Sequence, residues 1–205
     1  MEAEGILRRV HGGAESLHNL QREESVSEKS IKNLQEKERI GRYAAHLVND
    51  GDVIFLDAGT STSFVIPYLH SKDITVVTNS IRHAAELMNR HIHTIIIGGQ
   101  IKDSTEAVVG EMAMEQLSAM NFNKAFIGMN GVDKGYFTTP DMAEAHIKRL
   151  VIENASESFV LVDHSKFEHV SFARVAPVSH AFIVTDKISG NLQKDIEKQT
   201  EVVVV

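Results

Sequence analysis

The sequence contains no cysteine at any of its 205 positions. Disulfide bonds, thiolate nucleophiles and cysteine-ligated zinc or iron–sulfur sites are therefore excluded. Its apolar runs are short and broken by charged residues, and none approaches the roughly 20 residues that a membrane-spanning helix needs. The first residues also lack the basic and then apolar order of a secretory signal peptide. We therefore expect a cytoplasmic protein with no membrane partner.

Positive charge is scarce as well, since 21 Lys and Arg stand against 28 Asp and Glu and leave a net charge of −7. Surfaces that bind nucleic acid without sequence preference depend on clustered Lys and Arg, so this chain by itself should bind DNA poorly. Eleven histidines raise the question of a metal site. His91 and His93 would face one side of an extended segment, but no nearby carboxylate completes the pair. We predict no metal site and no cofactor.

From residue 52 onward, short β-branched runs alternate with segments of helical periodicity, a pattern typical of βαβ units. The runs are almost continuously apolar, as expected of strands covered on both faces, and span 53–56, 74–77, 94–97, 125–127, 159–162, 181–184 and 202–205. Helices are predicted over 37–48, 63–70, 81–90, 110–120, 141–154 and 191–199. The sequence thus predicts an α/β fold with a mostly parallel, Rossmann-like interior sheet of about six or seven strands flanked by helices.

The helix predicted over 141–154 begins at a suitable N-cap, Asp141, with Glu144 three residues later as in a capping box. Its apolar stripe leaves Glu144 and Lys148 off the predicted buried face. Upstream, residues 14–33 are rich in Gln, Ser, Glu and Lys, which is typical of a linker. The basic segment before it is too short to bury a core. We therefore divide the chain into the remnant of another domain (1–13), a linker (14–35) and one folded domain (36–205).

The strongest local motif is the loop 57–62, Asp-Ala-Gly-Thr-Ser-Thr, which follows an apolar strand and precedes a predicted helix. Such a loop presents backbone N–H groups and hydroxyls to an anion, as a phosphate-binding loop does. Ser and Thr are also ordinary helix caps, and the loop lacks both GxGxxG and GK[ST]. By itself this loop supports a phosphate site and a plain helix cap equally.

Other predicted strands also end in polar or glycine-containing loops. In parallel sheets, ligands bind outside the carboxyl ends of the strands, so these loops should converge. They are Thr78-Asn79-Ser80, Gly98-Gly99-Gln100, Gly128-Met129-Asn130-Gly131 and Asp163-His164-Ser165-Lys166. Lys166 could balance a phosphate, and Asp57 or Asp163 could accept hydrogen bonds from sugar hydroxyls. A solvated surface lysine is the alternative interpretation of Lys166.

Taken in order, several segments resemble the DeoR-type bacterial transcriptional repressors. Residues 5–14 are similar to the last helix end and wing of a winged helix-turn-helix. The other matching segments are the 57–62 loop, the Thr78-Asn79-Ser80 and Ile97-Gly98-Gly99 turns, 137–141 with 144–149, and 163–167. The order and spacing carry the resemblance, which is strongest to repressors of fructose phosphotransferase operons, with lactose and tagatose repressors second. It implies an N-terminal DNA-binding domain, of which this chain keeps only the end, and a sensor domain.

The sensor domain of that family is similar in fold to ribose-5-phosphate isomerase A, sugar-phosphate deaminases and CoA-transferases, which raises an enzyme alternative. Isomerases of this fold carry a phosphate loop like 59–62 and a serine–lysine pair like Ser165-Lys166. Where they also carry an acidic segment, this chain has Gly128-Met129-Asn130-Gly131. Proton abstraction from carbon needs a positioned base, which Met and Asn cannot supply. We therefore expect no enzyme, although Asp133 and Glu144 keep an isomerase or deaminase in view.

The resemblance implies a sensor that binds a phosphorylated sugar, with fructose 1-phosphate as the first candidate, and thereby controls operator DNA binding by the missing domain. A ligand controls DNA binding only by binding one conformational state of the repressor more tightly than another. Because operators are usually symmetric, we also expect a homodimer or homotetramer. The expected effector-binding residues are Asp57, Gly59, Thr60, Ser61, Thr62, Thr78, Asn79, Ser80, Gly98, Gly99, Gly128, Asn130, Glu144, Lys148, Asp163 and Lys166.

Overall fold

The computed structural model describes residues 7–10, 13–16 and 20–205. Near the N-terminus, β1 (Leu7–Val10) and β2 (Gly13–Ser16) form an antiparallel hairpin. β1 and the start of β2 lie in the segment 5–14 expected to be a wing, and β2 continues to Ser16 in the segment expected to be a linker. Residues 1–6 and 11–12 of the expected domain remnant lie outside the described residues. The proposed division into remnant, linker and sensor stays a prediction.

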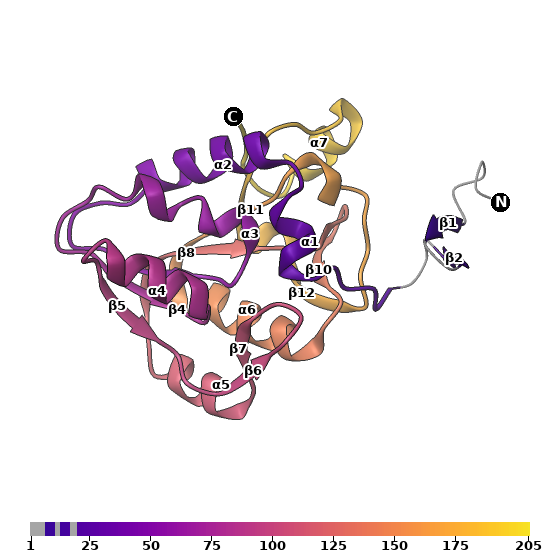
Figure 1. The fold of residues 1–205 in the computed structure, drawn as a ribbon. Coiled ribbons are helices and arrows are strands. Elements are labelled where there is room, and N and C mark those ends of the chain that lie inside the picture. Colours follow the sequence, from indigo (N-terminus) through magenta and orange to yellow (C-terminus); the bar gives the residue numbers. More distant parts are fainter. Residues whose placement is uncertain (1–6, 11–12, 17–19) are drawn as a thin grey trace.

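The centre of the molecule is a seven-stranded sheet in which all neighbouring strands are parallel (Figure 1). The strand order is β14-β13-β11-β8-β3-β4-β5. The strands are β3 (Val53–Leu56), β4 (Thr75–Thr78), β5 (His93–Ile96), β8 (Phe122–Gly128), β11 (Ala155–Leu161), β13 (Phe182–Thr185) and β14 (Val202–Val204). All seven correspond to predicted strands, and the predicted fold class is confirmed.

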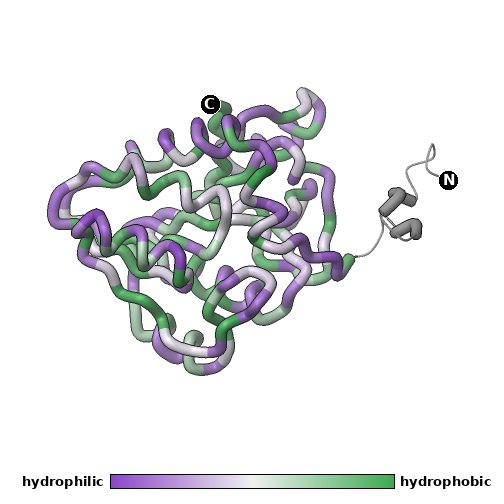
Figure 2. The backbone as a smooth tube through the Cα atoms, viewed as in Figure 1, coloured by the Kyte–Doolittle hydropathy of each residue, from purple (hydrophilic) through white to green (hydrophobic). Residues whose placement is uncertain are grey.

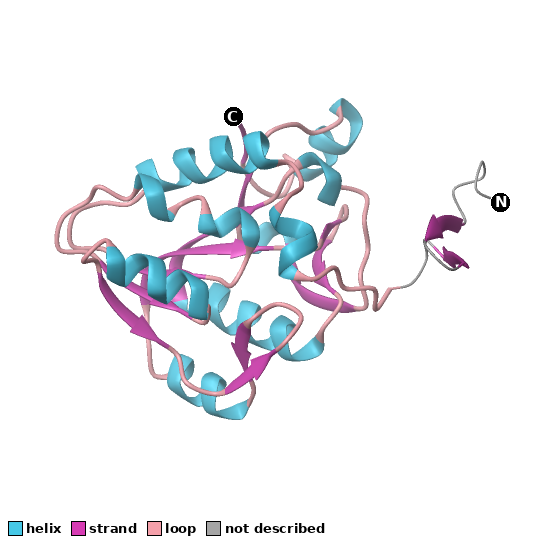
Figure 3. Ribbon diagram, in the orientation of Figure 1, coloured by secondary structure: helices cyan, strands magenta, loops and turns pink. Residues whose placement is uncertain are grey.

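Helices cover both faces of this sheet (Figure 3). On one face, α2 (Leu34–His46) and α4 (Ile81–Asn89) pack over a core that contains Ile54 and Leu56. On the other, α5 (Glu111–Ser118), α6 (Met142–Asn154) and α7 (Gly190–Ile196) pack over a core that contains Phe55. Because successive strand side chains point to opposite faces, one short apolar strand supplies both cores.

Smaller elements surround the carboxyl ends of the sheet. β6 (Gln100–Lys102) and β7 (Ala107–Val109) form a hairpin, and β9 (Gly131–Val132), β10 (Tyr136–Thr139) and β12 (Ala173–Pro177) form a three-stranded antiparallel sheet. A short 3-10 turn, η3 (Val178–His180), follows β12. Across the described residues, no helix is long and apolar enough to cross a membrane.

Two expected elements differ from the prediction. The predicted helix 63–70 is instead a single turn, α3 (Thr60–Ser63), followed by the 3-10 turn η1 (Ile66–Tyr68), because Pro67 cannot continue an α-helix. The segment interpreted as a linker contains α1 (Val26–Ser30), which Ser25 and Glu28 start with a capping box.

The expectation of an interior sheet is wrong at its edge strands, where Val204 of β14 is 49% exposed. The apolar edge strand β5, visible as a hydrophobic stretch in Figure 2, leaves Ile95 and Ile96 exposed by 38% and 47%. No further strand pairs with it in the described chain, so its outer hydrogen-bonding groups are open.

The predicted orientation of α6 is wrong for Glu144 and Lys148, which are buried beside Ile147 and Val151 instead of lying off the buried face. Helical periodicity assigns charged side chains to the solvent-facing side, whereas these two have charged partners inside the fold.

Candidate functional site

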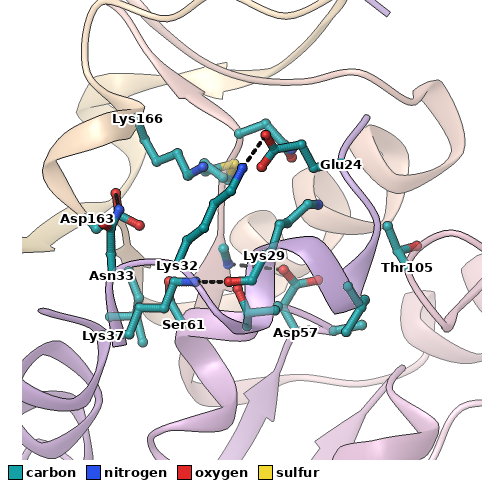
Figure 4. A pocket seen from close by; sticks show the side chains of 18 of the residues that line it. Glu24, Lys29, Lys32, Asn33, Lys37, Asp57, Ser61, Thr105, Asp163 and Lys166 are labelled. Carbon is teal, nitrogen blue, oxygen red and sulfur yellow. Dashed lines mark hydrogen bonds and ion pairs between the residues drawn. The ribbon is translucent and has the colours of Figure 1, made fainter. Parts of the chain in front are cut away.

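A cavity lies at the carboxyl ends of β3, β8 and β11, beneath α1 (Figure 4). From β3 the chain builds the sheet outward through β4 to β5, and from β8 it builds in the opposite direction through β11. The connections therefore leave neighbouring strands β3 and β8 in opposite directions, which opens a crevice at this point of an open parallel sheet. The topology by itself thus indicates a ligand site here.

The floor of the cavity is a buried ion pair. Asp57, directly after β3, is 1% exposed, and Lys148 of α6 is 5% exposed. The Lys148 ammonium contacts Asp57 Oδ2, and the same oxygen accepts the backbone N–H of Gly128 at 3.0 Å. A charge buried this deeply is costly unless paired and hydrogen-bonded, so each residue fixes the other.

Glu144 forms the wall beside this pair. Its Oε1 accepts hydrogen bonds from Thr105 Oγ1 at 2.7 Å and from Lys102 Nζ at 3.1 Å. Burial would raise the pKa of its carboxyl, but Lys148, Lys102 and the Thr105 hydroxyl outweigh that effect and hold the pKa below its ordinary value. Asp141 caps α6 by accepting the Glu144 N–H at 2.8 Å. The Glu144 carboxylate instead points to the cavity wall, so the capping-box role predicted for it is wrong.

The 57–62 loop presents two hydroxyls to the cavity. Thr62 Oγ1 donates to Asp57 O at 2.6 Å and accepts from the Gly59 N–H at 3.1 Å, which holds the turn. Thr60 and Ser61 line the cavity, and their hydroxyls make no hydrogen bond within the described part of the chain. Both donors are therefore available to a ligand.

Besides Lys148, four lysines line the cavity, and Figure 4 shows Lys29 and Lys32 from the α1 segment on the same side as Lys166 from the loop after β11. Lys32 Nζ contacts Glu24 at 2.6 Å. Lys37 Nζ donates to the carbonyl of Lys29 at 2.5 Å, and burial lowers its pKa from 10.5 to about 8. Across the described residues, neither Lys29, Lys37 nor Lys166 has a carboxylate within ion-pair distance. The four lysines outnumber the Glu24 and Asp163 carboxylates beside them, so this part of the cavity carries an excess of positive charge.

Asp163 faces these lysines from the end of β11. Its Oδ1 accepts from Ser165 Oγ at 2.5 Å, from the Ser165 N–H at 3.0 Å and from Asn33 Nδ2 at 2.9 Å. Burial would raise the pKa of its carboxyl, but these hydrogen bonds and the nearby Lys166 charge keep the pKa low. Asp163 therefore stays ionised and is largely engaged by the protein.

The cavity brings together ten of the sixteen residues expected from the sequence. They are Asp57, Gly59, Thr60, Ser61, Gly128, Asn130, Glu144, Lys148, Asp163 and Lys166. They come from the ends of three neighbouring strands and from α6, as convergence at one edge of a parallel sheet requires.

The other six residues lie outside the cavity lining, and most of them support the surrounding loops. They are Thr62, Thr78, Asn79, Ser80, Gly98 and Gly99. Asn79 holds the Ala58 N–H at 3.0 Å, and Ser80 caps α4 by accepting the His83 N–H at 3.3 Å. The strand β4 that delivers them stands one position beyond β3, so its loop supports the site from behind.

Sequence reasoning missed Lys29, Lys32, Asn33 and Lys37, all in or next to the segment taken for a linker, and Thr105 in the β6–β7 hairpin. One signal was available, because Ser25-Val26-Ser27-Glu28 has the spacing of a capping box and predicts a helix start. Nothing in the local pattern indicated which strand ends that helix would cover.

The histidines and carboxylates do not gather into a metal site within the part of the chain that is described, where no group of three or more potential ligands occurs. His93 Nδ1 lies 3.1 Å from Thr75 Oγ1 in the neighbouring strand. Asp133, the carboxylate next to the Met129-Asn130 segment, is exposed and does not line the cavity.

Residues 32–187 match the family model described as the DeoR C-terminal sensor domain. The chain is 39% identical over 207 residues to "Uncharacterized HTH-type transcriptional regulator FruR" of Bacillus subtilis, covering all of this chain and 82% of that protein. It is 36% identical over 170 residues to the lactose phosphotransferase system repressor of Staphylococcus aureus strain N315, covering 81% of this chain and 68% of that protein.

Among solved structures, a D-ribose-5-phosphate isomerase in complex with phospho-erythronic acid matches with a TM-score of 0.50 at 19% identity. The match covers 65% of this chain and only 54% of the isomerase. At this identity the likeness shows a shared fold, and it agrees with the predicted fold class. The family match, the two regulator relatives and the arrangement of the sheet together show that this chain belongs to the family of DeoR C-terminal sensor domains.

Proposed function

We propose that this domain binds a phosphorylated sugar in the cavity at the ends of β3, β8 and β11, and that occupancy controls operator binding by the full-length repressor. The observation that carries the proposal is the cluster of Lys29, Lys37 and Lys166, for which the described residues offer no carboxylate at ion-pair distance, in a chain of net charge −7. A phosphate supplies the missing negative charge, and lysine ammonium groups and hydroxyls are its usual partners.

The hydroxyls of Thr60 and Ser61 lie at the same cavity and add neutral donors for the phosphate oxygens. The rest of the lining suits a sugar, because a small number of fixed polar groups can orient its hydroxyls. Asp57 and Asn130 are the candidate acceptors for the sugar hydroxyls. Each is held in place by the protein: Asp57 accepts the Gly128 N–H, and Asn130 Oδ1 accepts a hydrogen bond from Thr139 Oγ1 at 3.0 Å. The phosphate therefore lies in our proposal toward the lysines and the sugar ring toward Asp57.

Fructose 1-phosphate is our first candidate, since a relative of 39% identity is named FruR and another is named a lactose phosphotransferase system repressor. In the proposed arrangement, residues 1–13 end a DNA-binding domain and 14–35 link it to the sensor. The effector then changes operator affinity by preferring one arrangement of subunits.

A thermal-shift panel of fructose 1-phosphate, fructose 6-phosphate and tagatose 6-phosphate tests the proposal. Ligand at 100 times its Kd stabilises a folded protein by about 2.7 kcal/mol, which moves the transition measurably upward. If no sugar phosphate moves the transition, the proposed function is wrong.

Calorimetry tests the assigned residues. The double variant Thr60→Ala with Lys166→Ala should weaken sugar-phosphate binding at least about tenfold, because it removes a hydroxyl and a charged partner. Lys72→Ala is the matched control, since Lys72 is exposed and lies before β4, away from the cavity. Unchanged affinity in the double variant would remove Thr60 and Lys166 from the site.

A sugar-phosphate isomerase or deaminase is the second candidate, and the fold shared with D-ribose-5-phosphate isomerase is the observation that favours it. Such an enzyme needs a carboxylate free to remove a proton from carbon. Asp57, Glu144 and Asp163 each accept two or more hydrogen bonds or ion-pair contacts from the protein. We therefore expect no product when sugar phosphates are incubated overnight with the protein and followed by NMR.

A further inference from the structure

The cavity is smaller than the ligand that we assign to it. Its volume is about 60 Å³, which is room for only a few water molecules. Pockets for small molecules usually hold about 300 Å³ or more. Larger cavities of about 390 Å³ and 250 Å³ adjoin it, the first lined in part by Lys29 and Lys32 and the second by Val26 and Ser30. Because α1 borders all three spaces, moving α1 is the direct way to enlarge the site.

The contacts of α1 are those of an element that moves at low cost. None of its five residues is fully buried, although Lys29 is partly buried, and Ile31 directly after the helix is 76% exposed. The helix is held mainly by polar contacts: the Val26 N–H donates to Ser104 O at 3.0 Å, and Lys37 Nζ donates to the Lys29 carbonyl at 2.5 Å. Just before the helix, Glu23 accepts from Lys102 Nζ at 2.7 Å. Elements with few buried apolar contacts open with a small free-energy cost.

Lys29 is the residue of α1 whose surroundings indicate an anionic ligand. It lines both the central cavity and the adjoining 390 Å³ cavity, and no carboxylate within the described chain lies at ion-pair distance from it. Burial lowers the pKa of its ammonium group, and the nearby Lys148 and Lys166 charges act in the same direction, against the attraction of Glu144 and Glu23. An anion between Lys29 and Lys166 would relieve this repulsion.

We propose that α1 is a lid over the effector site and that Lys29 is the anion-binding residue through which a bound phosphate holds the lid closed. The inference rests on the proposed function and deepens it. Glu23, just before α1, is joined through Lys102 to Glu144 beside the Lys148–Asp57 pair. Site occupancy therefore acts on the segment that leads from the sensor toward the N-terminus.

Hydrogen–deuterium exchange on the 205-residue chain, with and without saturating fructose 1-phosphate, tests the lid. We expect backbone amides of residues 25–33 to exchange at least about tenfold more slowly with the ligand present. Lys29→Met should weaken binding about tenfold or more and abolish this slowing, and Lys29→Arg should restore part of both. Lys72→Met, on the exposed surface before β4, should behave like the wild type.

The outcomes separate the two proposals. If fructose 1-phosphate binds but the exchange of residues 25–33 is unchanged, or Lys29→Met binds as tightly as the wild type, the lid is wrong and the sensor function stands. If neither fructose 1-phosphate nor the other sugar phosphates bind, both are wrong.

A second variant tests the anchoring of α1. Glu23→Gln removes the ion pair with Lys102 and should speed exchange of residues 25–33 without ligand, while exchange in β3 and β8 stays unchanged as a check on folding. Unchanged exchange of residues 25–33 in this variant would contradict the proposed closure.

Discussion

The charge of Lys37 has a free-energy cost that depends on what occupies the cavity beside it. Burial lowers its pKa to about 8, with Asp163 and Glu24 as the nearby acidic groups and Lys29 and Lys166 as the nearby cations. A phosphate bound near it favours the protonated form, and phosphate esters stay dianionic above their second pKa near 6. Protonation of this lysine and anion binding are therefore linked.

We accordingly expect the affinity for a sugar phosphate to be highest below about pH 8 and to fall as the pH rises through that value, by up to about tenfold at pH 9. The sign follows because the free protein then holds Lys37 neutral and must take up a proton to bind. Calorimetry at pH 7, 8 and 9 measures this directly. Lys37→Arg keeps its charge over this range and should flatten the profile; a wild-type affinity independent of pH would show that Lys37 does not face the anion.

Among the single residues of the site, those that could be predicted lie at or just after the ends of apolar strands, such as Asp57, Gly128 and Asp163. Strand ends of a parallel sheet share one edge, so chain position alone indicates proximity. Lys148 and Glu144 were also named, but for their match to a family segment, since periodicity assigned them to the wrong face of α6. Lys29 and Lys37 could not be found in this way, because nothing local marks a polar segment that folds back over distant strands.

Among the elements, α2 and α3 meet at a contact that only glycine permits. A Cβ at Gly41 of α2 would lie 2.4 Å from the backbone carbon of Phe64, which directly follows α3. Backbone cannot move aside as a flexible side chain can, so this close approach positions the 57–62 loop relative to the helix that carries Lys37.

Gly41→Ala should therefore destabilise the fold by about 1–3 kcal/mol, as overpacked cores generally do. Urea unfolding measures the change. Gly135→Ala is the matched control, because a Cβ there meets nothing within 4 Å, and we expect a change within about 0.5 kcal/mol. A stability equal to that of the wild type at position 41 would mean that α2 shifts freely against α3.

The whole molecule, if monomeric, would leave the apolar edge of β5 in water, with Ile95 and Ile96 about 38% and 47% exposed. Natural proteins usually protect such edges, and repressors that read symmetric operators are usually symmetric oligomers. We therefore expect light scattering to give a mass of two or four times the 22.7 kDa of one chain. A single 22.7 kDa species at tens of micromolar protein would contradict this prediction.

The sequence by itself determined the parallel α/β sheet and the sensor family, because apolar period, strand length and motif order are local properties that survive without coordinates. The exclusion of cysteine chemistry was determined in the same way. Only the tertiary structure decided that α1 covers the site, that Glu144 and Lys148 face inward and that the Asn79 loop supports the cavity from behind. Those features depend on which distant groups balance each buried charge, and that pairing is set by packing across the sheet.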